Sequence, residues 1–330
     1  MTITLKHPGG VIKIEEIGLN QRSILVEPAN RSVFVSKTQC VTSYSTELIE
    51  SILSVKGPGY LVDEIMRDED PNYVQKSIRY DVLSYVSEQE LDGTRILDFG
   101  CGAGASTMIL ARMLPNAEIV GVELEKRLLD VASLRKKFYR FDQLELLLSP
   151  DGTKLPDQIG EFDYIMMSGV FEHLLPHERK ILLPKLWGHL KPQGVLFVSQ
   201  LPHRYFPFEM HTTRLPLTNY LPDKFALYYA RQFSKKVKKY ESWEDLLRRG
   251  IRGGSDKEIR SMLESLLPHK PILLNPRYAG VKDRIDLWYK VTASTRSSTI
   301  KNIELFVIRM IKVLFGHIFT PLLSLAIKKL

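Results

Sequence analysis

The chain has 330 residues, of which 44% are hydrophobic and 25% charged, ordinary values for a soluble globular protein with one large domain or a catalytic domain with flanking additions. The net charge of +8 favours acidic partners, namely nucleic acid, anionic lipid or anionic substrates, without choosing among them. Two cysteines are too few for a disulfide framework, and the first residues lack the apolar segment of a secretory signal, so we expect a cytoplasmic protein with free thiols.

The first 90 residues are predicted to form strands followed by helices. Apolar and polar residues alternate over 11–17, 23–28 and 32–37, which predicts a small β meander or an edge extension of the sheet. Between residues 44 and 90 the apolar residues recur at helical spacing, with a break at Gly57-Pro58-Gly59. This extension indicates no function by itself.

From residue 94 to 201 the pattern changes to alternating strands and helices. The predicted strands are 95–99, 118–124, 144–148, 162–169 and 195–201, and the predicted helices are 106–114, 125–141 and 178–190. Repeated β-α-β units predict an α/β fold, a Rossmann-like doubly wound and mostly parallel sheet with helices on both faces. Ligands bind to such sheets at the carboxyl ends of the strands.

The remainder is predicted to be mostly helical, which gives four segments: an extension over 1–90, a domain over 91–222, a helical or substrate-side region over 223–302, and an amphipathic helix over 303–330. Polar residues three or four apart line one face of that last helix, and Pro321 is expected to kink it. Arg309, Lys312, Lys328 and Lys329 near its polar edge suit a helix lying in a membrane interface; the alternative is docking on the catalytic domain or on a second subunit.

A glycine-rich loop follows the first strand of the α/β segment and precedes a helix. It reads Asp98-Phe99-Gly100-Cys101-Gly102-Ala103-Gly104, and its glycines let the backbone approach a ligand closely. The spacing also satisfies a relaxed dinucleotide fingerprint. Asp98 distinguishes a dinucleotide from S-adenosylmethionine as the ligand of this loop. A carboxylate beside the loop repels a pyrophosphate and suits the ammonium group of S-adenosylmethionine.

Two further carboxylates follow the next two strands. Glu123, 25 residues after Asp98, is placed to accept hydrogen bonds from the ribose hydroxyls of a dinucleotide or of S-adenosylmethionine, so it does not select between them. Asp151 is placed to accept a bond from an adenine amino group, with Gly152 allowing close approach to the ring; the alternative is a solvated turn, because Pro-Asp-Gly is strong turn chemistry.

Five motifs in this order resemble a class I S-adenosylmethionine-dependent methyltransferase of the small-molecule type. They are ILDFGCGAG, VGVELE, SPDGTKLPD, FDYIMMSGVFEHL and LKPQGVLFVS, which together cover roughly 94–200. The resemblance implies that Asp98 and Gly100 to Gly104 hold the methionine part of the cofactor, Glu123 the ribose and Asp151 the adenine. It places the backbone around Ser168 and Gly169 under the methionine end. Residues after 200 match no motif of the family, so the resemblance does not define the acceptor.

Candidate catalytic groups follow the fourth and the closing strands. Glu172-His173 follows the fourth, and His203, Glu209 and His211 follow the closing one. We assign catalytic roles to His211, Glu209 and His173, with Glu209 orienting the imidazole of His211; the alternative is that these histidines bond to loop backbone. The aromatic residues Tyr205, Phe206, Phe208 and Tyr220 either wall an acceptor pocket or pack as a loop core. No metal ligands are assigned from the sequence.

Two basic segments, 234–239 and Arg248 to Arg252, are interpreted as a solvated face, because no RNA-binding module accompanies them. We therefore expect methyl transfer by in-line displacement to a small-molecule, lipid-linked or glycan acceptor, and no nucleic-acid partner. Two alternatives stay open, a nicotinamide-dependent oxidoreductase and a non-catalytic cofactor-binding module. The partners considered are a membrane surface, through 303–330, and a second copy of the chain.

Overall fold

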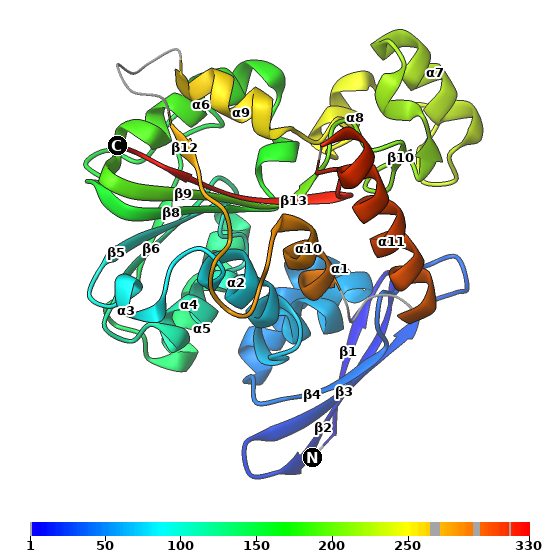
Figure 1. Cartoon of the computed structure of the whole chain (residues 1–330). Coiled ribbons are helices and arrows are strands. Elements are labelled where there is room, and N and C mark those ends of the chain that lie inside the picture. Colours follow the sequence, from blue (N-terminus) through cyan, green and yellow to red (C-terminus); the bar gives the residue numbers. More distant parts are fainter. Residues whose placement is uncertain (1, 265–270, 293–297, 317) are drawn as a thin grey trace. The chain divides into compact units, whose positions relative to one another are not determined.

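The computed structural model describes residues 2–264, 271–292, 298–316 and 318–330 (Figure 1). The chain divides into two compact units. The first unit comprises Met1–Ile78 and Cys101–Leu148, and the second comprises Arg79–Gly100 and Ser149–Leu330. The chain passes from the second unit to the first between Gly100 and Cys101, inside the glycine loop.

In the first unit, the N-terminal strands form an antiparallel meander in the order β1-β2-β3-β4. The predicted strands 11–17 and 23–28 correspond to β2 and β3, whereas the sequence pattern predicts no strand over β1. Their bounds are β1 (Thr2–His7), β2 (Gly10–Gly18), β3 (Gln21–Pro28) and β4 (Gln39–Thr42). Ile12 lies opposite Val26 and Ile14 opposite Ile24, and all four are buried. Alternation thus puts one face of the sheet into the core and leaves the other exposed.

The strand predicted over 32–37 is wrong, because this stretch is irregular after a turn at Arg31-Ser32 and the fourth strand begins only at Gln39. The Asn30 side chain accepts a hydrogen bond from the backbone N–H of Ser32 at 2.9 Å. Such a local bond from an asparagine side chain competes with strand pairing.

Helix α1 (Thr46–Glu69) covers the meander, with Leu48, Ile49 and Ile52 packed into the same core. It starts at Ser45, whose hydroxyl accepts from the backbone N–H of Leu48. Gly57 has a φ of 67°, so the predicted break at Gly57-Pro58-Gly59 is confirmed as a kink inside this helix.

The first unit also contains half of the α/β segment. It includes α4 (Ala105–Met113), β6 (Glu118–Glu123), α5 (Lys126–Tyr139) and β7 (Glu145–Leu148). Strands β6 and β7 pair in parallel, with Val122 opposite Leu147. Each of these elements lies within two residues of its predicted bounds.

The second unit contains five strands in the order β12-β13-β9-β8-β5. Their bounds are β5 (Arg95–Phe99), β8 (Phe162–Ser168), β9 (Leu190–Pro202), β12 (Ile272–Leu273) and β13 (Leu322–Lys328). Strand β8 is parallel to both β5 and β9, whereas β13 is antiparallel to β9. Helices α6 and α9 lie on one face of this sheet and α10 on the other (Figure 1). The predicted Rossmann-like α/β fold is confirmed.

The other described elements complete the chain. Two single-turn 3₁₀ segments are η1 (Phe171–His173) and η2 (Thr218–Tyr220), and a short ribbon pairs β10 (Phe208–Glu209) with β11 (Leu215–Pro216). The helices are α2 (Val74–Leu83), α3 (Glu88–Leu91), α6 (Pro176–Gly188), α7 (Asp223–Phe233), α8 (Trp243–Arg248), α9 (Asp256–Glu264), α10 (Arg284–Thr292) and α11 (Ser298–Phe315). No helix among the described residues is long and apolar enough to cross a membrane.

The helix predicted over 303–330 is half wrong. Helix α11 ends at Phe315, and Leu322–Lys328 instead forms the strand β13 along β9, with Leu325 opposite Val198. A strand covered on both faces is a continuous apolar run, which periodicity does not distinguish from a buried helix. Lys328 and Lys329 therefore lie beyond the helix, and Lys329 donates to the carbonyl of Trp187 at 2.8 Å.

Candidate functional site

The second-unit part of the glycine loop begins at the end of β5. Asp98 is buried there, 2% exposed, in register with Met166 of β8. Gly100 has a φ of 76°, and a Cβ at this position would lie 2.5 Å from a methyl group of Val170. Backbone conformation and close packing both require glycine at position 100.

The first-unit part of the loop contains two glycines with different environments. A Cβ on Gly104 would lie 2.8 Å from the Cβ of Ala132, so this glycine lets α4 and α5 pack closely. Gly102 has a φ of 58°, and a Cβ there would meet no described atom within 4 Å. Gly102 is thus the loop glycine whose Cα faces open space, where a ligand has room to approach.

Glu123 ties the loop to the end of β6. Its Oε2 accepts from the backbone N–H of Gly102 at 2.8 Å, and its Oε1 accepts from Leu124 and Glu125 at 2.8 and 2.9 Å. An ionised carboxylate has about four acceptor positions, so these bonds leave room for a hydroxyl donor. The ribose-binding role of Glu123 remains a prediction.

Arg135 supports the same loop from behind, and sequence reasoning missed it. This side chain of α5 is fully buried and donates to the carbonyl of Ala103 at 2.6 Å. It also donates to the Glu64 carboxylate at 3.0 Å and to the Tyr44 hydroxyl at 3.0 Å. The N-terminal extension therefore holds the loop through one arginine, whose basic neighbours on α5 gave no sign that it alone is buried.

Asp151 and Gly152 form the turn that was the alternative interpretation. Asp151 Oδ1 accepts from the N–H and the hydroxyl of Thr153, both at 2.8 Å, and these bonds lower its pKa to about 2. A Cβ on Gly152 would lie 2.8 Å from the Glu178 carboxylate, so the close approach at this glycine is to that side chain. An adenine contact by Asp151 remains a prediction.

Three of the chemically active side chains meet in the second unit: Glu172 and His173 of η1, directly after β8, and His211. One donor atom from each lies within 4.8 Å of the others. The His173 Nε2 is 3.9 Å from the Glu172 carboxylate, and the rings of His173 and His211 are 5.5 Å apart. Gly250, at φ 87°, permits this cluster, because a Cβ there would lie 2.8 Å from His211 and 3.0 Å from Glu172.

Partial or full loss of hydration shifts the pKa of all three groups of the cluster, although only Glu172 is fully buried and the His211 side chain reaches the surface. Burial raises the pKa of Glu172, which is 1% exposed, to about 7. Loss of hydration lowers the pKa of His173. It also lowers the pKa of His211, and the charge of the neighbouring His173 lowers that pKa further. Loss of hydration disfavours the charged form of each group. The environment therefore favours neutral imidazoles, the form that binds metals and accepts protons.

Glu209 does not orient the His211 ring. Its carboxylate accepts from the backbone N–H groups of His211 and Thr212 at 2.8 and 2.9 Å, and from the Thr213 backbone and hydroxyl. It therefore caps the turn that carries His211. The carboxylate beside the ring is that of Glu172, which directly precedes His173 in the chain.

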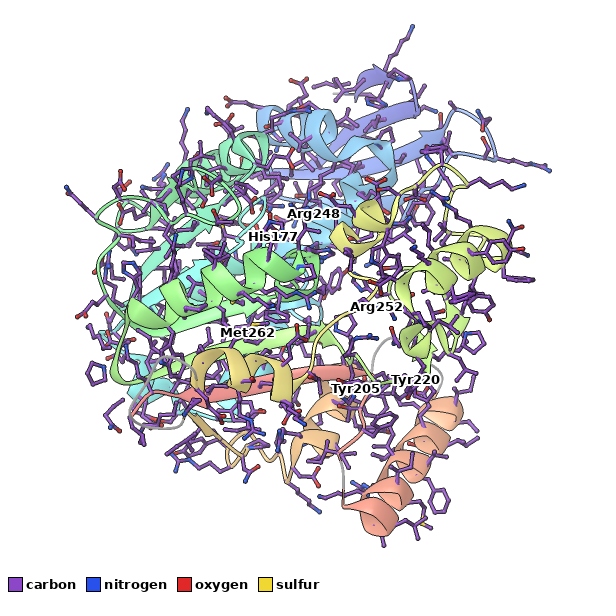
Figure 2. The ribbon with its side chains drawn as sticks, turned by 90° about the horizontal axis from the view of Figure 1, so that it is seen from above. His177, Tyr205, Tyr220, Arg248, Arg252 and Met262 are labelled. Carbon is purple, nitrogen blue, oxygen red and sulfur yellow. The ribbon has the colours of Figure 1, made fainter. Side chains whose placement is uncertain are left out.

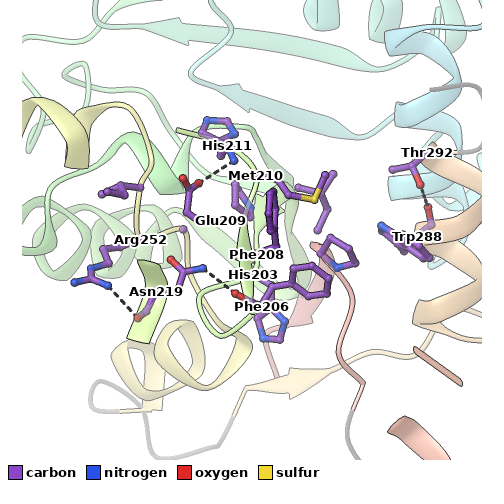
Figure 3. A pocket seen from close by; sticks show the side chains of 15 residues that line it. His203, Phe206, Phe208, Glu209, Met210, His211, Asn219, Arg252, Trp288 and Thr292 are labelled. Atoms are coloured by element: carbon purple, nitrogen blue, oxygen red, sulfur yellow. Dashed lines mark hydrogen bonds between the residues drawn. The ribbon is translucent and has the colours of Figure 1, made fainter. Parts of the chain in front are cut away.

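A cavity of about 230 Å³ opens beside His211 (Figure 3). Phe206, Phe208, Met210 and Trp288 give it an apolar wall, and it begins where β9 ends, at Pro202. Tyr205 and Tyr220, predicted to wall a pocket with the two phenylalanines, lie outside it. They are half exposed and side by side, with the Tyr220 hydroxyl donating to the Tyr205 carbonyl (Figure 2).

The remaining sequence-predicted residues have structural partners. Ser168 ends β8 opposite Ser199, and the buried His203 contacts the Thr320 carbonyl through Nδ1 at 3.1 Å. The basic stretch after 247 is solvated only in part, because the Arg248 side chain is 44% exposed whereas that of Arg252 is 8% exposed. Arg248 makes two 2.6 Å bonds to Glu178, and Arg252 is buried against the carbonyls of η2.

A family model described as a methyltransferase domain matches residues 97–196, the stretch from β5 into β9. The chain contains a class I S-adenosylmethionine-dependent methyltransferase domain. This match includes Asp98, the loop glycines, Glu123 and Glu172-His173, whereas His211 and the cavity wall lie after it.

Curated relatives match the methyltransferase domain. A protein-L-isoaspartate O-methyltransferase of Nitrobacter winogradskyi is 37% identical over 123 residues, covering 37% of this chain and 52% of the relative. A malonyl-[acyl-carrier protein] O-methyltransferase of Bacillus cytotoxicus is 28% identical over 144 residues, 42% of this chain and 46% of the relative. The chain thus spans about half the length of these relatives.

The solved structures to which the chain is similar are more distant in sequence. The plantazolicin methyltransferase BpumL, in complex with SAH, is 14% identical with a TM-score of 0.43, over 86% of this chain and 93% of that one. A methyltransferase from Clostridium acetobutylicum is 19% identical with a TM-score of 0.38, over 47% of this chain and 60% of that one.

Proposed function

We propose that the chain transfers methyl groups from S-adenosylmethionine to a small apolar acceptor bound in the cavity beside His211. The observation that carries this is a methyltransferase domain whose unit-two strands β8 and β9 run in parallel into the cluster and the cavity. Ligands of such sheets bind beyond the carboxyl ends of the strands.

The residues divide the work as follows. Asp98 and the loop glycines hold the methionine part, Glu123 the ribose and Asp151 the adenine, while Ser168 borders the methionine end. Bound S-adenosylmethionine would supply a methyl group on a sulfonium, and in-line attack of the acceptor on that methyl carbon would break the bond to sulfur and release S-adenosylhomocysteine. The chain's task is alignment and exclusion of water, which the aromatic wall provides. His211 and His173 remain the catalytic candidates, with Glu172 in place of Glu209 as their carboxylate.

Calorimetric titration with S-adenosylmethionine, and with NADH in parallel, tests the cofactor. Gly102→Ala has a matched control in Gly93→Ala, because both glycines have positive φ (58° and 66°) and open space at the Cβ position. Each substitution strains the backbone by about 1–2 kcal/mol. We expect micromolar affinity for S-adenosylmethionine that Gly102→Ala weakens at least tenfold and Gly93→Ala leaves unchanged. Preference for NADH would refute the proposal.

A labelled-methyl assay tests the acceptor side. Labelled S-adenosylmethionine is incubated with the protein and a cell extract, and the label is followed into organic and aqueous phases. Phe208→Ala removes part of the cavity wall, and Tyr220→Ala removes a similarly exposed ring outside it. We expect label in the organic phase and a KM for the acceptor raised roughly 10-fold or more by Phe208→Ala alone. Absence of transfer would leave only a cofactor-binding module.

We also propose that α11 meets a lipid surface, which suits an apolar or lipid-linked acceptor. Its exposed apolar side chains recur every three or four residues and form one stripe: Ile300, Ile303, Phe306, Val307, Met310, Val313 and Leu314. Arg309 is exposed on the same helix, and the chain carries a net charge of +8, so an anionic surface complements it.

Flotation with phosphatidylcholine vesicles, with and without phosphatidylglycerol, tests this contact. The double variant Phe306→Ser/Val313→Ser breaks the stripe, and Phe225→Ser removes an equally exposed ring on α7. We expect the wild type and the α7 variant to float with anionic vesicles and the double variant to stay behind. A dimer that the double variant dissociates, without flotation, would assign the stripe to a second copy instead.

A further inference from the structure

The cluster of Glu172, His173 and His211 presents two imidazoles and a carboxylate to one point in the second unit. We propose that this cluster binds a divalent transition-metal ion. Two histidines and one carboxylate are a ligand set for zinc and for ferrous iron, and they leave further coordination positions open.

The distances allow closure on an ion by side-chain adjustment. The donor atoms lie within 4.8 Å of one another, and the His173 Nε2 is 3.9 Å from the Glu172 carboxylate. Nitrogen and oxygen ligands of zinc lie about 2.0–2.2 Å from the ion, so tetrahedral ligands are roughly 3.4 Å apart. The widest separation therefore has to shrink by about 1.5 Å, within the reach of side-chain rotation.

The tautomer of His173 is fixed by its surroundings. Its Nδ1 lies 2.7 Å from the carbonyl oxygen of Arg248. A carbonyl only accepts hydrogen bonds, so Nδ1 carries the proton and the Nε2 lone pair faces the cluster. A backbone carbonyl on the far nitrogen is the usual outer partner of a metal-binding histidine. Arg248 is in turn held by its two bonds to Glu178.

Glu172 supplies the independent observation. Its side chain is 1% exposed, and its Oε2 has no hydrogen-bond partner among the described residues. A buried carboxylate oxygen without a partner is unfavourable, and a bound cation removes the penalty. The neighbouring Arg179 does not fill this role, because its guanidinium donates to the Glu172 and Leu174 backbone carbonyls and to the Glu258 carboxylate.

Because the proposed metal site lies beside the cavity, a bound ion could contact an acceptor in that cavity. His211 belongs both to the cluster and to the cavity wall, and no hydrogen bond of its ring to a described residue competes with coordination. An ion with three protein ligands has room for an oxygen atom of the acceptor, which it would orient and make easier to deprotonate. This role rests on the proposed function; metal binding itself does not.

Metal titration of the chelator-treated full chain tests the site, with Zn²⁺ followed by calorimetry and Co²⁺ by its visible absorption. We expect one ion per chain and a Co²⁺ spectrum typical of nitrogen and oxygen ligands. Glu172→Gln and His211→Asn should each weaken binding by at least 10–100-fold, the loss that changes in outer partners already cause. His177→Asn, an exposed histidine next to the cluster in sequence, should change nothing.

Failure has a distinct signature. Wild-type protein that binds S-adenosylmethionine but neither ion below millimolar concentration would overturn the metal site and leave the proposed function intact. Equal binding by wild type and by both cluster variants would also overturn it, because the ion would then sit elsewhere. Circular dichroism of each variant guards against loss of fold, and the two cluster variants change different elements.

Discussion

At the scale of residues, the structure shows which charged side chains are buried, and the composition of a segment does not indicate this. Arg135 is one of five basic residues between 126 and 137, yet it alone of them is fully buried. Glu64 and Asp68 of α1 surround it, and these two carboxylates also pair with Lys56 and Arg112. A buried ion pair is sensitive to loss of one partner, because the other charge is left uncompensated.

We expect Arg135→Met to destabilise the protein by about 3–5 kcal/mol, the range for breaking a buried pair. The glycine loop would also lose its bond at Ala103, so cofactor affinity should fall. Urea unfolding measures the first effect and calorimetry the second. Lys137→Met, on the exposed side of the same helix, is the control and should shift the midpoint little. A loss below 1 kcal/mol would mean that the network contributes nothing to stability.

Asp81 is a buried acid in the second unit. Its two oxygens accept from Gln200 at 2.9 Å and from Ser324 at 2.5 Å, but burial outweighs these bonds and raises its pKa to about 6. The folded pKa lies above the ordinary 3.8, so folding favours the protonated acid. The associated stability is present below pH 4 and is lost as the pH rises through 6.

Asp81→Asn removes this titration. As the pH rises from 4 to 8, we expect the free energy of unfolding of the variant to increase relative to that of the wild type by up to about 3 kcal/mol. This is the free-energy equivalent of the pKa difference between the folded and unfolded states. Unfolding in urea at several pH values measures the gain. Asp245→Asn should show the opposite trend, because backbone bonding lowers the pKa of that exposed residue. A gain independent of pH would exclude ionisation of Asp81 as the cause.

At the scale of elements, α11 and β13 show how one sequence pattern has two outcomes. Over 298–315 the helix exposes its apolar stripe, whereas over 322–328 the apolar residues are buried on both faces of a strand. Ser324, which continues the helical spacing of polar residues, instead bonds to the buried Asp81. Pro321 precedes the strand and does not kink a helix.

The two elements therefore respond differently to the same truncation. Leu325→Ala in β13 removes a side chain that is 1% exposed, and we expect a loss of about 2–5 kcal/mol. Val313→Ala in α11, where the side chain is 79% exposed, should change stability by less than about 0.5 kcal/mol. Thermal or urea unfolding of both variants provides the comparison. Equal small losses would contradict the pairing of β13 with β9.

At the scale of the whole molecule, the family match covers 97–196 and leaves both flanks outside it. The first unit adds the meander and α1, which reach the glycine loop through Arg135. The second unit adds the cavity, the histidine His211 and the apolar stripe of α11. The flanks thus carry the features that distinguish this chain from a bare methyltransferase domain.

Cofactor binding should stabilise the entire chain by mass action. S-adenosylmethionine at 100 times its Kd should add about 2.7 kcal/mol to the free energy of unfolding. Differential scanning fluorimetry with increasing ligand measures the shift, and NADH at the same concentrations is the comparison. A shift produced by NADH and not by S-adenosylmethionine would favour the oxidoreductase alternative.

The sequence by itself determined the α/β order, the glycine loop and the two central strands of the meander, because each depends on local periodicity and on glycine conformation. The bounds of the elements from β5 to α6 needed no tertiary information for this reason, whereas β9 begins at Leu190, five residues before its predicted start. The sequence also predicted the break at Gly57 and the free thiols of Cys40 and Cys101.

Only the tertiary structure decided which polar groups meet. It paired His211 with Glu172, 39 residues earlier, and turned Glu209 to the backbone. It buried Arg135 and made 322–328 a strand beside β9. Partners distant in the chain determine burial and the competition among hydrogen bonds, and a periodic pattern in one segment carries no information about them.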